Sequence, residues 1–201
     1  MLTLNQSLLI GRGKFRACYV HPNDRNKCIK VFVAEPSDML HRDQREYNHL
    51  IKKKKSTAMI ARHFSIEMTN MGEGLVCELI RDFNGEISKS LADYLKDDFN
   101  EEMASQIRKA YFEFKKYVFG ELVLLRDLNA SNLLYKRMTS AEGTLIVIDG
   151  LGNNDFIPIA NYLRIWAGLK VKRKWQRFEW FLYKHFGQTK TLQYILDGLV
   201  N

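Results

Sequence analysis

The pattern of apolar residues changes near residue 81, and this change constrains the fold more than any other feature of the chain. Before it, short segments rich in β-branched and aromatic residues alternate with glycine and polar turns, whereas after it apolar residues recur mostly at helical spacing. Residues 1–81 therefore predict a small antiparallel sheet with one helix. Residues 82–201 predict a mainly helical part, and the two parts together predict the α+β class.

Turn residues and apolar periodicity divide each part into elements. The predicted elements of the first part are two strands around a glycine turn in 8–22, a strand in 27–33, a helix after the N-cap candidate Ser37, and strands in 65–70 and 74–80. The predicted elements of the second part are a short helix in 88–99, a longer helix in 100–122, strands in 132–136 and 143–149, and helices from 159 onward. The tryptophan and phenylalanine residues of 162–180 are expected in the core rather than in a ligand cage.

Composition favours a reducing compartment. The chain has 201 residues, and its three cysteines show no metal-binding spacing and cannot all pair. No apolar run reaches the length of about 18 residues that a membrane span needs, and the N-terminal segment lacks the basic region of a signal peptide. We therefore expect a cytoplasmic protein without a transmembrane segment.

Most of the formal net charge of +8 lies in residues 161–190. This stretch contains one acid, Glu179, and eight cationic residues: Arg164, Lys170, Lys172, Arg173, Lys174, Arg177, Lys184 and Lys190. Such a stretch attracts an anionic acceptor or surface, although a solvated helix has the same composition. Both interpretations remain open from the sequence.

A polar segment with apolar flanks, Arg-Asp-Leu-Asn-Ala-Ser-Asn in 126–132, is the first candidate site. Its Asp127 and Asn132 alone would be compatible with an ordinary loop. Further motifs precede and follow it in a defined order. These are the glycine turn at 11–15, Lys30 in an apolar strand, Glu46 in the following helix, and Asp149-Gly150 at the end of the last strand.

The ordered motifs resemble the protein-kinase signature set over residues 8–152. Residues 126–132 resemble the catalytic loop, and the segment 75–80 resembles the strand that leads into the adenine-binding hinge. Within kinase-like proteins, the short chain and the catalytic-loop sequence resemble the bacterial family of the PhoP regulatory network protein YrbL. The resemblance implies a compact two-lobed fold, with lobes at 1–81 and 82–201 and ATP bound between them.

The resemblance also implies which residues bind the nucleotide. Gly11 and Gly13 would let backbone N–H groups approach the phosphates, with Phe15 in the same loop. Lys30 would hold the α- and β-phosphates. The residues implied beside them are Glu46 as the partner of Lys30, and Glu78 and Ile80 next to the adenine. From spacing alone, Glu35 is an alternative to Glu46, a plain hairpin turn is an alternative for the glycines, and a strand-edge lysine reaching water is an alternative for Lys30.

The implied catalytic and metal roles fall on three oxygen-bearing residues. Asp127 would accept or orient the proton of the attacking hydroxyl. Asn132 and Asp149 would bind Mg²⁺, which prefers hard oxygen ligands beside substrate phosphates. The hairpin between these two residues is expected to return them to one edge.

Several positions depart from the kinase pattern. Leu125 stands where His is common, Arg16 replaces the third glycine and is expected to stiffen or charge the loop, and Gly150-Leu151 follows Asp149 in place of Phe-Gly. No Ser or Thr occurs between 145 and 188, which argues against activation-loop phosphorylation. The short C-terminal part favours a small molecule or glycolipid over a protein as the acceptor.

The leading functional hypothesis is an ATP- and Mg²⁺-dependent phosphotransferase that acts on an unidentified hydroxyl. The first alternative is a pseudokinase-type regulator, which binds nucleotide or a partner without phosphoryl transfer. A basic nucleic-acid-binding protein ranks last, because it leaves the ordered acids of 127–149 without a role.

Overall fold

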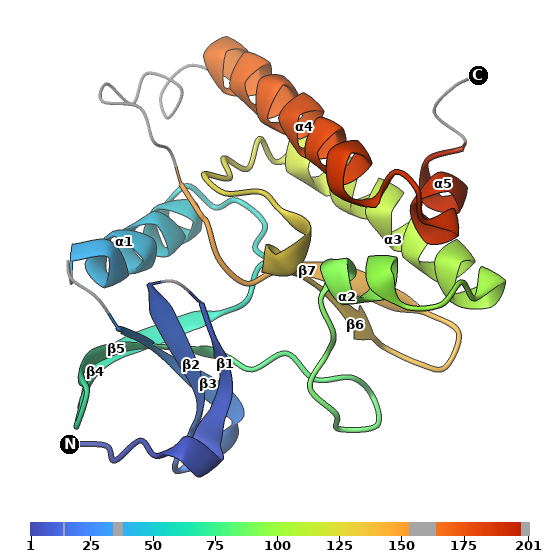
Figure 1. Ribbon diagram of the computed structural model, residues 1–201. Helices are drawn as coiled ribbons and strands as arrows, with labels where there is room; N and C mark the ends of the chain where they lie inside the picture. Colours follow the sequence, from blue (N-terminus) through green and yellow to red (C-terminus); the bar gives the residue numbers. More distant parts are fainter. Residues whose placement is uncertain (14, 34–37, 153–163, 198–201) are drawn as a thin grey trace. The chain divides into compact units, whose positions relative to one another are not determined.

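The computed structural model describes residues 1–13, 15–33, 38–152 and 164–197 (Figure 1). Its fold is of the α+β class, as predicted, with a larger antiparallel sheet, a two-stranded hairpin and several α-helices. The chain divides into two compact units. The first comprises Met1–Thr57 and Ala61–Ile80, and the second comprises Ala58–Ile60 and Arg81–Asn201.

The first unit is a five-stranded antiparallel sheet with the strand order β1-β2-β3-β5-β4. Its elements are η1 Gln6–Leu8, β1 Leu9–Arg12, β2 Arg16–His21, β3 Asp24–Phe32, α1 Asp38–Lys52, β4 His63–Thr69 and β5 Gly72–Glu78. The predicted order of three strands, a helix and two strands is confirmed. The N-cap candidate Ser37 lies outside the described residues.

The starts of β3 and β5 are among the strand boundaries that differ from the prediction. β3 begins at Asp24, because the polar segment before Lys27 pairs with the end of β2 through His21 and Asp24. β5 begins at Gly72, so the connection from β4 is shorter than the predicted turn. Both errors have one cause: polar and glycine residues next to a tight turn still take part in strand pairing.

Both faces of the five-stranded sheet bury apolar side chains. On one face, Tyr19, Ile29 and Val76 pack with Leu4 of the N-terminal segment. The other face contains a second cluster, formed by Cys28, Leu40, Leu75, Cys77 and Leu79. The alternation of strand side chains accounts for this division, since successive residues point to opposite faces.

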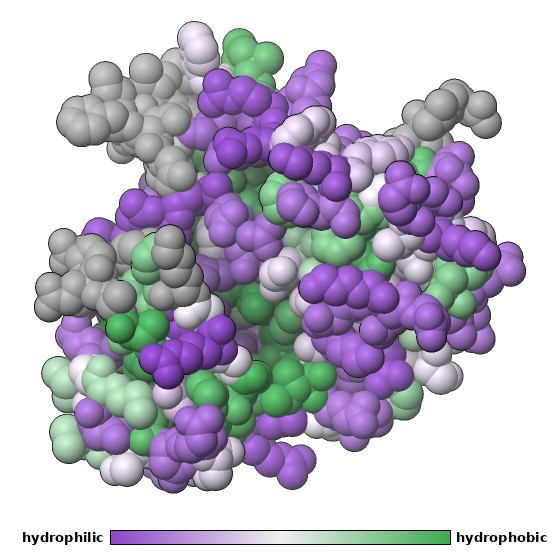
Figure 2. Space-filling model, in the orientation of Figure 1, coloured by the Kyte–Doolittle hydropathy of each residue, from purple (hydrophilic) through white to green (hydrophobic). Residues whose placement is uncertain are grey.

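The second unit consists of helices and one β-hairpin. Its elements are α2 Leu91–Lys96, α3 Glu101–Gly120, η2 Ala130–Asn132, β6 Leu133–Arg137, β7 Gly143–Val147, α4 Arg164–Phe186 and α5 Lys190–Leu196. Polar caps begin several helices: Ser90 and Asp93 form a capping box at α2, and the side chain of Asn100 accepts a hydrogen bond from the Met103 N–H at 2.8 Å. In Figure 2, hydrophilic residues cover much of the visible face of this unit.

Aromatic residues of α3 and α4 form the core of the second unit. Tyr111 and Phe114 are fully buried, and the ring of Trp175 lies 5.5 Å from that of Tyr111. The core prediction for the aromatic residues of 162–180 is thus confirmed for Trp175 and Phe178, which are 2% and 1% exposed. It is wrong for Trp166 and Trp180, which are 57% and 60% exposed, because these two lie on the face of α4 away from α3.

Among the described residues, we find no helix that combines the length and the apolar character needed to cross a bilayer.

Candidate functional site

The loop that carries Asp127 is attached to the chain segment after β7. Leu125 and Leu151 form an antiparallel bridge, and the Arg126 N–H donates to the Gly150 carbonyl at 2.6 Å. Farther along, the Gly152 N–H donates to the Leu124 carbonyl at 2.9 Å. These backbone hydrogen bonds hold the segment at 124–127 beside the residues that follow Asp149.

Gly150 is required by this close approach. Its φ is +79°, and a Cβ at this position would lie 2.7 Å from the carbonyl oxygen of Asp127. An L-amino acid with a side chain would meet both the unfavourable dihedral and the backbone contact. The Asp-Gly pair at 149–150, found in the sequence by resemblance, therefore has a local steric reason.

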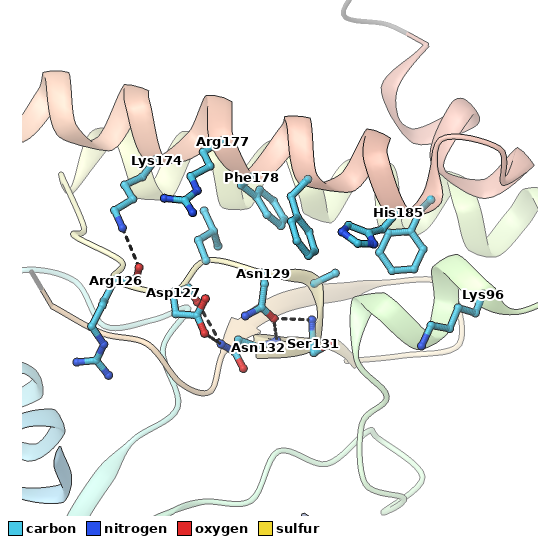
Figure 3. Close-up of a pocket in the computed structure, with 14 residues that line it drawn as sticks. Lys96, Arg126, Asp127, Asn129, Ser131, Asn132, Lys174, Arg177, Phe178 and His185 are labelled. Atoms are coloured by element: carbon cyan, nitrogen blue, oxygen red, sulfur yellow. Dashed lines mark hydrogen bonds between the residues drawn. The ribbon is translucent and has the colours of Figure 1, made fainter. Parts of the chain in front are cut away.

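Two asparagines organise the loop. The Asn129 side chain caps η2 by accepting hydrogen bonds from the Ser131 and Asn132 N–H groups, both at 3.0 Å. The Asn132 side-chain amide nitrogen donates to Asp127 Oδ2 and to the Asp127 carbonyl, both at 3.1 Å (Figure 3). Because the nitrogen faces Asp127, the amide oxygen of Asn132 points to the opposite side.

The β6–β7 hairpin brings Asn132 and Asp149 to the same end. Leu133 pairs with Val147, and the Ile148 N–H donates to the Asn132 carbonyl at 3.0 Å. Asp149 is partly buried, and its Oδ1 accepts a hydrogen bond from the Gly150 N–H at 2.7 Å. The expected return of both residues to one edge is confirmed.

The donor atoms of this edge suit Mg²⁺. The amide oxygen of Asn132 and the carboxylate of Asp149, the two predicted metal ligands, are hard oxygen ligands. The described residues contain no group of three or more His, Cys, Asp or Glu side chains arranged to hold a metal. A magnesium ion at this edge would therefore need phosphate oxygens or water to complete its coordination, as such ions do at nucleotide sites.

A pocket of about 850 Å³ lies between the loop and α4 (Figure 3). Its lining residues are Lys96, Arg126–Asn132, Lys174, Arg177, Phe178, Phe181, His185 and Phe186. The Lys174 Nζ donates to the Arg126 carbonyl at 2.8 Å. Burial, followed by the charges of Lys170 and Arg177, lowers the pKa of Lys174, whereas the Asp127 carboxylate acts in the opposite direction.

The predicted nucleotide-binding residues lie in the first unit. Lys30 is only 7% exposed and belongs to β3, a central strand, so the alternative of a strand-edge lysine reaching water is wrong. Glu46 is partly buried on α1. Its pairing with Lys30 stays a prediction, and the alternative partner Glu35 lies outside the described residues.

The glycine turn connects β1 and β2. The Gly13 N–H donates to the Arg16 carbonyl at 2.7 Å. A Cβ at Gly11 would have no heavy atom within 4 Å, and a Cβ at Gly13 would meet only the Arg16 carbonyl, at 3.7 Å. Packing within the protein therefore does not require glycine at either position. Phe15, in the same turn, is 51% exposed.

The remaining two predicted residues lie at the end of the first unit. Glu78 is the last residue of β5, and its Oε2 accepts a hydrogen bond from the Arg62 N–H at 3.2 Å. Ile80 is buried and is the last residue of the unit. Their roles beside an adenine ring stay predictions.

The sequence comparison identifies the family. The sequence profile of the PhoP regulatory network protein YrbL matches residues 2–181. The chain belongs to this family. It is 29% identical over 181 residues to the uncharacterized protein YrbL of Escherichia coli (strain K12), a match that covers 89% of this chain and 86% of that protein. The YrbL protein of Shigella flexneri matches with the same identity and coverage.

Sequence reasoning missed three features of this YrbL-family chain. Arg16, at the position of the third glycine, forms an ion pair with Asp43 of α1 at 2.7 Å, which ties β2 to the helix. Asn129 was not predicted as a cap, although an asparagine before a short helical turn is a recognisable signal. The approach of Lys174 to the loop had no signal in the sequence, because it depends on how α4 packs.

Proposed function

We propose that this YrbL-family protein is a kinase-like phosphotransferase that uses ATP and Mg²⁺ to phosphorylate a hydroxyl group. One observation carries the proposal. The side chains of Asp127 and Asn132 are hydrogen-bonded to each other beside an open pocket, and Asp149 lies at the same end of the β6–β7 hairpin. A carboxylate with two further oxygen ligands is the arrangement that positions a hydroxyl next to a metal-bound phosphate.

Each residue has a distinct part in this chemistry. Asp127 is exposed, so an acceptor hydroxyl can reach its carboxylate and donate its proton there. The amide nitrogen of Asn132 holds that carboxylate in place, which leaves its oxygen for the metal. When bound, Mg²⁺ would neutralise charge on the transferred phosphate. In the first unit, the buried Lys30 would hold the α- and β-phosphates, and the glycine turn would admit them.

A pseudokinase-type regulator is the second candidate, and two observations favour it. The family is described as part of a regulatory network. In the chain itself, the ion pair between Arg16 and Asp43 ties β2 to α1, directly after the turn that would cover the phosphates. A protein of this kind would bind nucleotide through the same residues and transfer nothing.

Nucleotide binding and turnover separate these candidates. ATP with Mg²⁺ should raise the melting temperature of the protein, since a ligand that binds only the folded state stabilises it. Lys30→Ala and Asp149→Ala should each remove this shift while the far-ultraviolet circular dichroism spectrum stays unchanged. Asp127→Asn should keep the shift and lower turnover by about 10²–10⁴-fold, because it removes the proton acceptor and keeps both predicted metal ligands.

Two results would count against the proposal. If millimolar ATP leaves the melting temperature of the parent protein unchanged, with or without Mg²⁺, the phosphotransferase fails, and a regulator would have to act by binding a partner instead of nucleotide. If nucleotide binds but the parent protein and Asp127→Asn show the same residual hydrolysis, the regulator is the better description.

A further inference from the structure

The pocket beside Asp127 is lined by more positive charge than the Asp127 carboxylate can balance. Lys96, Lys174, Arg177 and His185 line it, and Asp127 is the one acidic residue in its lining among the residues that the structure describes. Figure 3 shows Lys174 and Arg177 on α4 directed toward the loop, whereas the Arg126 side chain points away from α4. Phosphoryl transfer to a neutral hydroxyl does not explain a cationic wall of this kind.

The acid of α4 does not neutralise this wall. Glu179, the single acid of the helix, accepts hydrogen bonds from Lys115 Nζ at 2.9 Å and Tyr111 Oη at 3.1 Å, both on α3. Its carboxylate also accepts from Trp175 Nε1 at 2.6 Å. The Glu179 carboxylate is thus held at the α3 interface, and Lys174 and Arg177 remain available to an anion in the pocket.

Lys174 is the best placed of the pocket cations. Its Nζ donates to the carbonyl of Arg126, the residue before Asp127, at 2.8 Å. An ammonium group has three donors, so this hydrogen bond leaves others for a ligand. Burial lowers the pKa of Lys174 most, and repulsion by the charges of Lys170 and Arg177 lowers it further. A bound anion would relieve this repulsion.

Besides the polar residues Asn129, Ser131 and Asn132, the lining has an aromatic side. Phe178 is 1% exposed, and the ring of Phe181 lies tilted against that of His185, with ring centroids 4.0 Å apart. Phe181 and Phe186 also line this aromatic side of the pocket. A volume of about 850 Å³ lies in the range of sites for small organic ligands. The lining therefore suits a molecule with one anionic group and one ring or other apolar part.

We infer that the acceptor is a small soluble molecule that already carries a phosphate group, which Lys174 and Arg177 bind while its hydroxyl meets Asp127. This inference rests on the proposed function. In the transfer step, the acceptor hydroxyl oxygen bonds to the γ-phosphorus of ATP and the bond from that phosphorus to the β,γ-bridging oxygen breaks. ADP leaves, and the hydroxyl proton passes to the Asp127 carboxylate.

Calorimetric titration with phenyl phosphate tests the pocket without nucleotide. The parent protein should bind phenyl phosphate and should not bind benzyl alcohol, which keeps the ring and lacks the phosphate. The double variant Lys174→Gln/Arg177→Gln should bind phenyl phosphate at least about 10-fold more weakly, since two charge-assisted contacts are lost. Phe181→Ala should weaken phenyl phosphate more than inorganic phosphate.

The matched control is Lys172→Gln/Arg173→Gln. These residues lie on the same helix, are exposed and do not line the pocket, so the control removes the same charge elsewhere. Phenyl phosphate affinity should change much less in the control than in Lys174→Gln/Arg177→Gln, since neither control residue lines the pocket, although the Arg173 charge does act on Lys174. An equal loss in both double variants would overturn the inference, because it would show general attraction to positive charge.

The melting-temperature shift with ATP and Mg²⁺, measured on the same variants, separates this inference from the proposed function. If the parent protein binds nucleotide but not phenyl phosphate, the inference fails and the proposed function stands. If phenyl phosphate binds as expected but nucleotide does not, the proposed function fails, and with it the acceptor role. If vesicles of phosphatidylcholine and phosphatidic acid bind through Lys174 and Arg177 while phenyl phosphate does not, the ligand is a lipid headgroup and the inference is wrong.

Discussion

Gly150 meets two requirements at once, a positive φ of +79° and a distance of 2.7 Å between its would-be Cβ and the Asp127 carbonyl oxygen. Gly85, in a loop of the same unit, has a similar φ of +85° but no heavy atom within 4 Å of its would-be Cβ. An alanine at Gly85 would meet only the unfavourable positive φ, whereas an alanine at Gly150 would also meet the Asp127 backbone. Comparing the two positions therefore separates the energetic cost of the φ angle from the cost of the backbone contact.

Gly150→Ala should destabilise the protein more than Gly85→Ala. The dihedral alone costs about 1–2 kcal/mol for alanine, and the contact with the Asp127 backbone should bring the total at Gly150 to about 2–4 kcal/mol. The free energy of unfolding in urea measures both changes. Equal losses at the two positions would mean that the loop moves freely away from residue 150.

Lys30 shows at the same scale how position in a sheet changes the interpretation of a residue. The sequence left open whether it lies at a strand edge, where its amine could reach water. In the structure β3 is flanked by β2 and β5, and Lys30 is 7% exposed. This burial excludes the strand-edge alternative, and the role of Lys30 in holding phosphates stays a prediction.

At the scale of elements, α4 has three faces with different surroundings. Trp175 and Phe178 pack against α3, and Lys174 with Arg177 line the pocket. Trp180 lies on the outer face and is 60% exposed. The packing of Trp175 on α3 sets the rotation of the helix, and this rotation directs Lys174 toward the Asp127 loop.

Trp175→Ala and Trp180→Ala should differ sharply in stability. Trp175 is 2% exposed, so its removal should leave a cavity and cost about 3–5 kcal/mol in the free energy of unfolding. Trp180→Ala, the matched control on the same helix, should cost less than about 1 kcal/mol. Denaturant unfolding followed by circular dichroism measures both. Similar losses would show that the core of the second unit does not depend on Trp175.

At the scale of the whole molecule, the net charge of +8 is concentrated on α4. The structure divides the cations that the sequence grouped together. Lys170 is 7% exposed and Lys174 lines the pocket, whereas Lys172 and Arg173 are exposed on the outer face. The part of the predicted stretch at 161–163 lies outside the described residues. If this charge attracts polyanions, we expect the exposed cations to account for most of the attraction.

The triple variant Lys172→Gln/Arg173→Gln/Lys184→Gln should elute from a heparin column at lower salt than the parent protein. Its affinity for ATP with Mg²⁺ should change little, because screening limits the effect of distant surface charges. The control, Lys52→Gln/Lys53→Gln/Lys54→Gln, removes the same charge from the region at the end of α1. Equal elution of the two variants would mean that α4 is merely a solvated helix.

Local patterns in the sequence were sufficient for the order of the elements and for most of the candidate loop. Period-two strands, helical periodicity and turn residues act over short distances, so the three strands, the helix and the two strands of the first unit could be predicted. The start of β3 at Asp24 could not be predicted, because this polar segment belongs to the strand only through its pairing with His21 of β2. Ladder pairing is a property of two segments, and a single segment does not reveal it.

The sequence by itself determined which residues share the loop, since Asp127 and Asn132 are near neighbours and the β6–β7 hairpin returns the chain to Asp149. Only the tertiary structure decided what faces that loop. Lys174 and Arg177 follow it by more than forty residues along the chain, and they meet it because Trp175 and Phe178 pack on α3. Such packing depends on the shapes of several buried side chains together, so the composition of α4 could indicate a positive helix but not the direction of each charge.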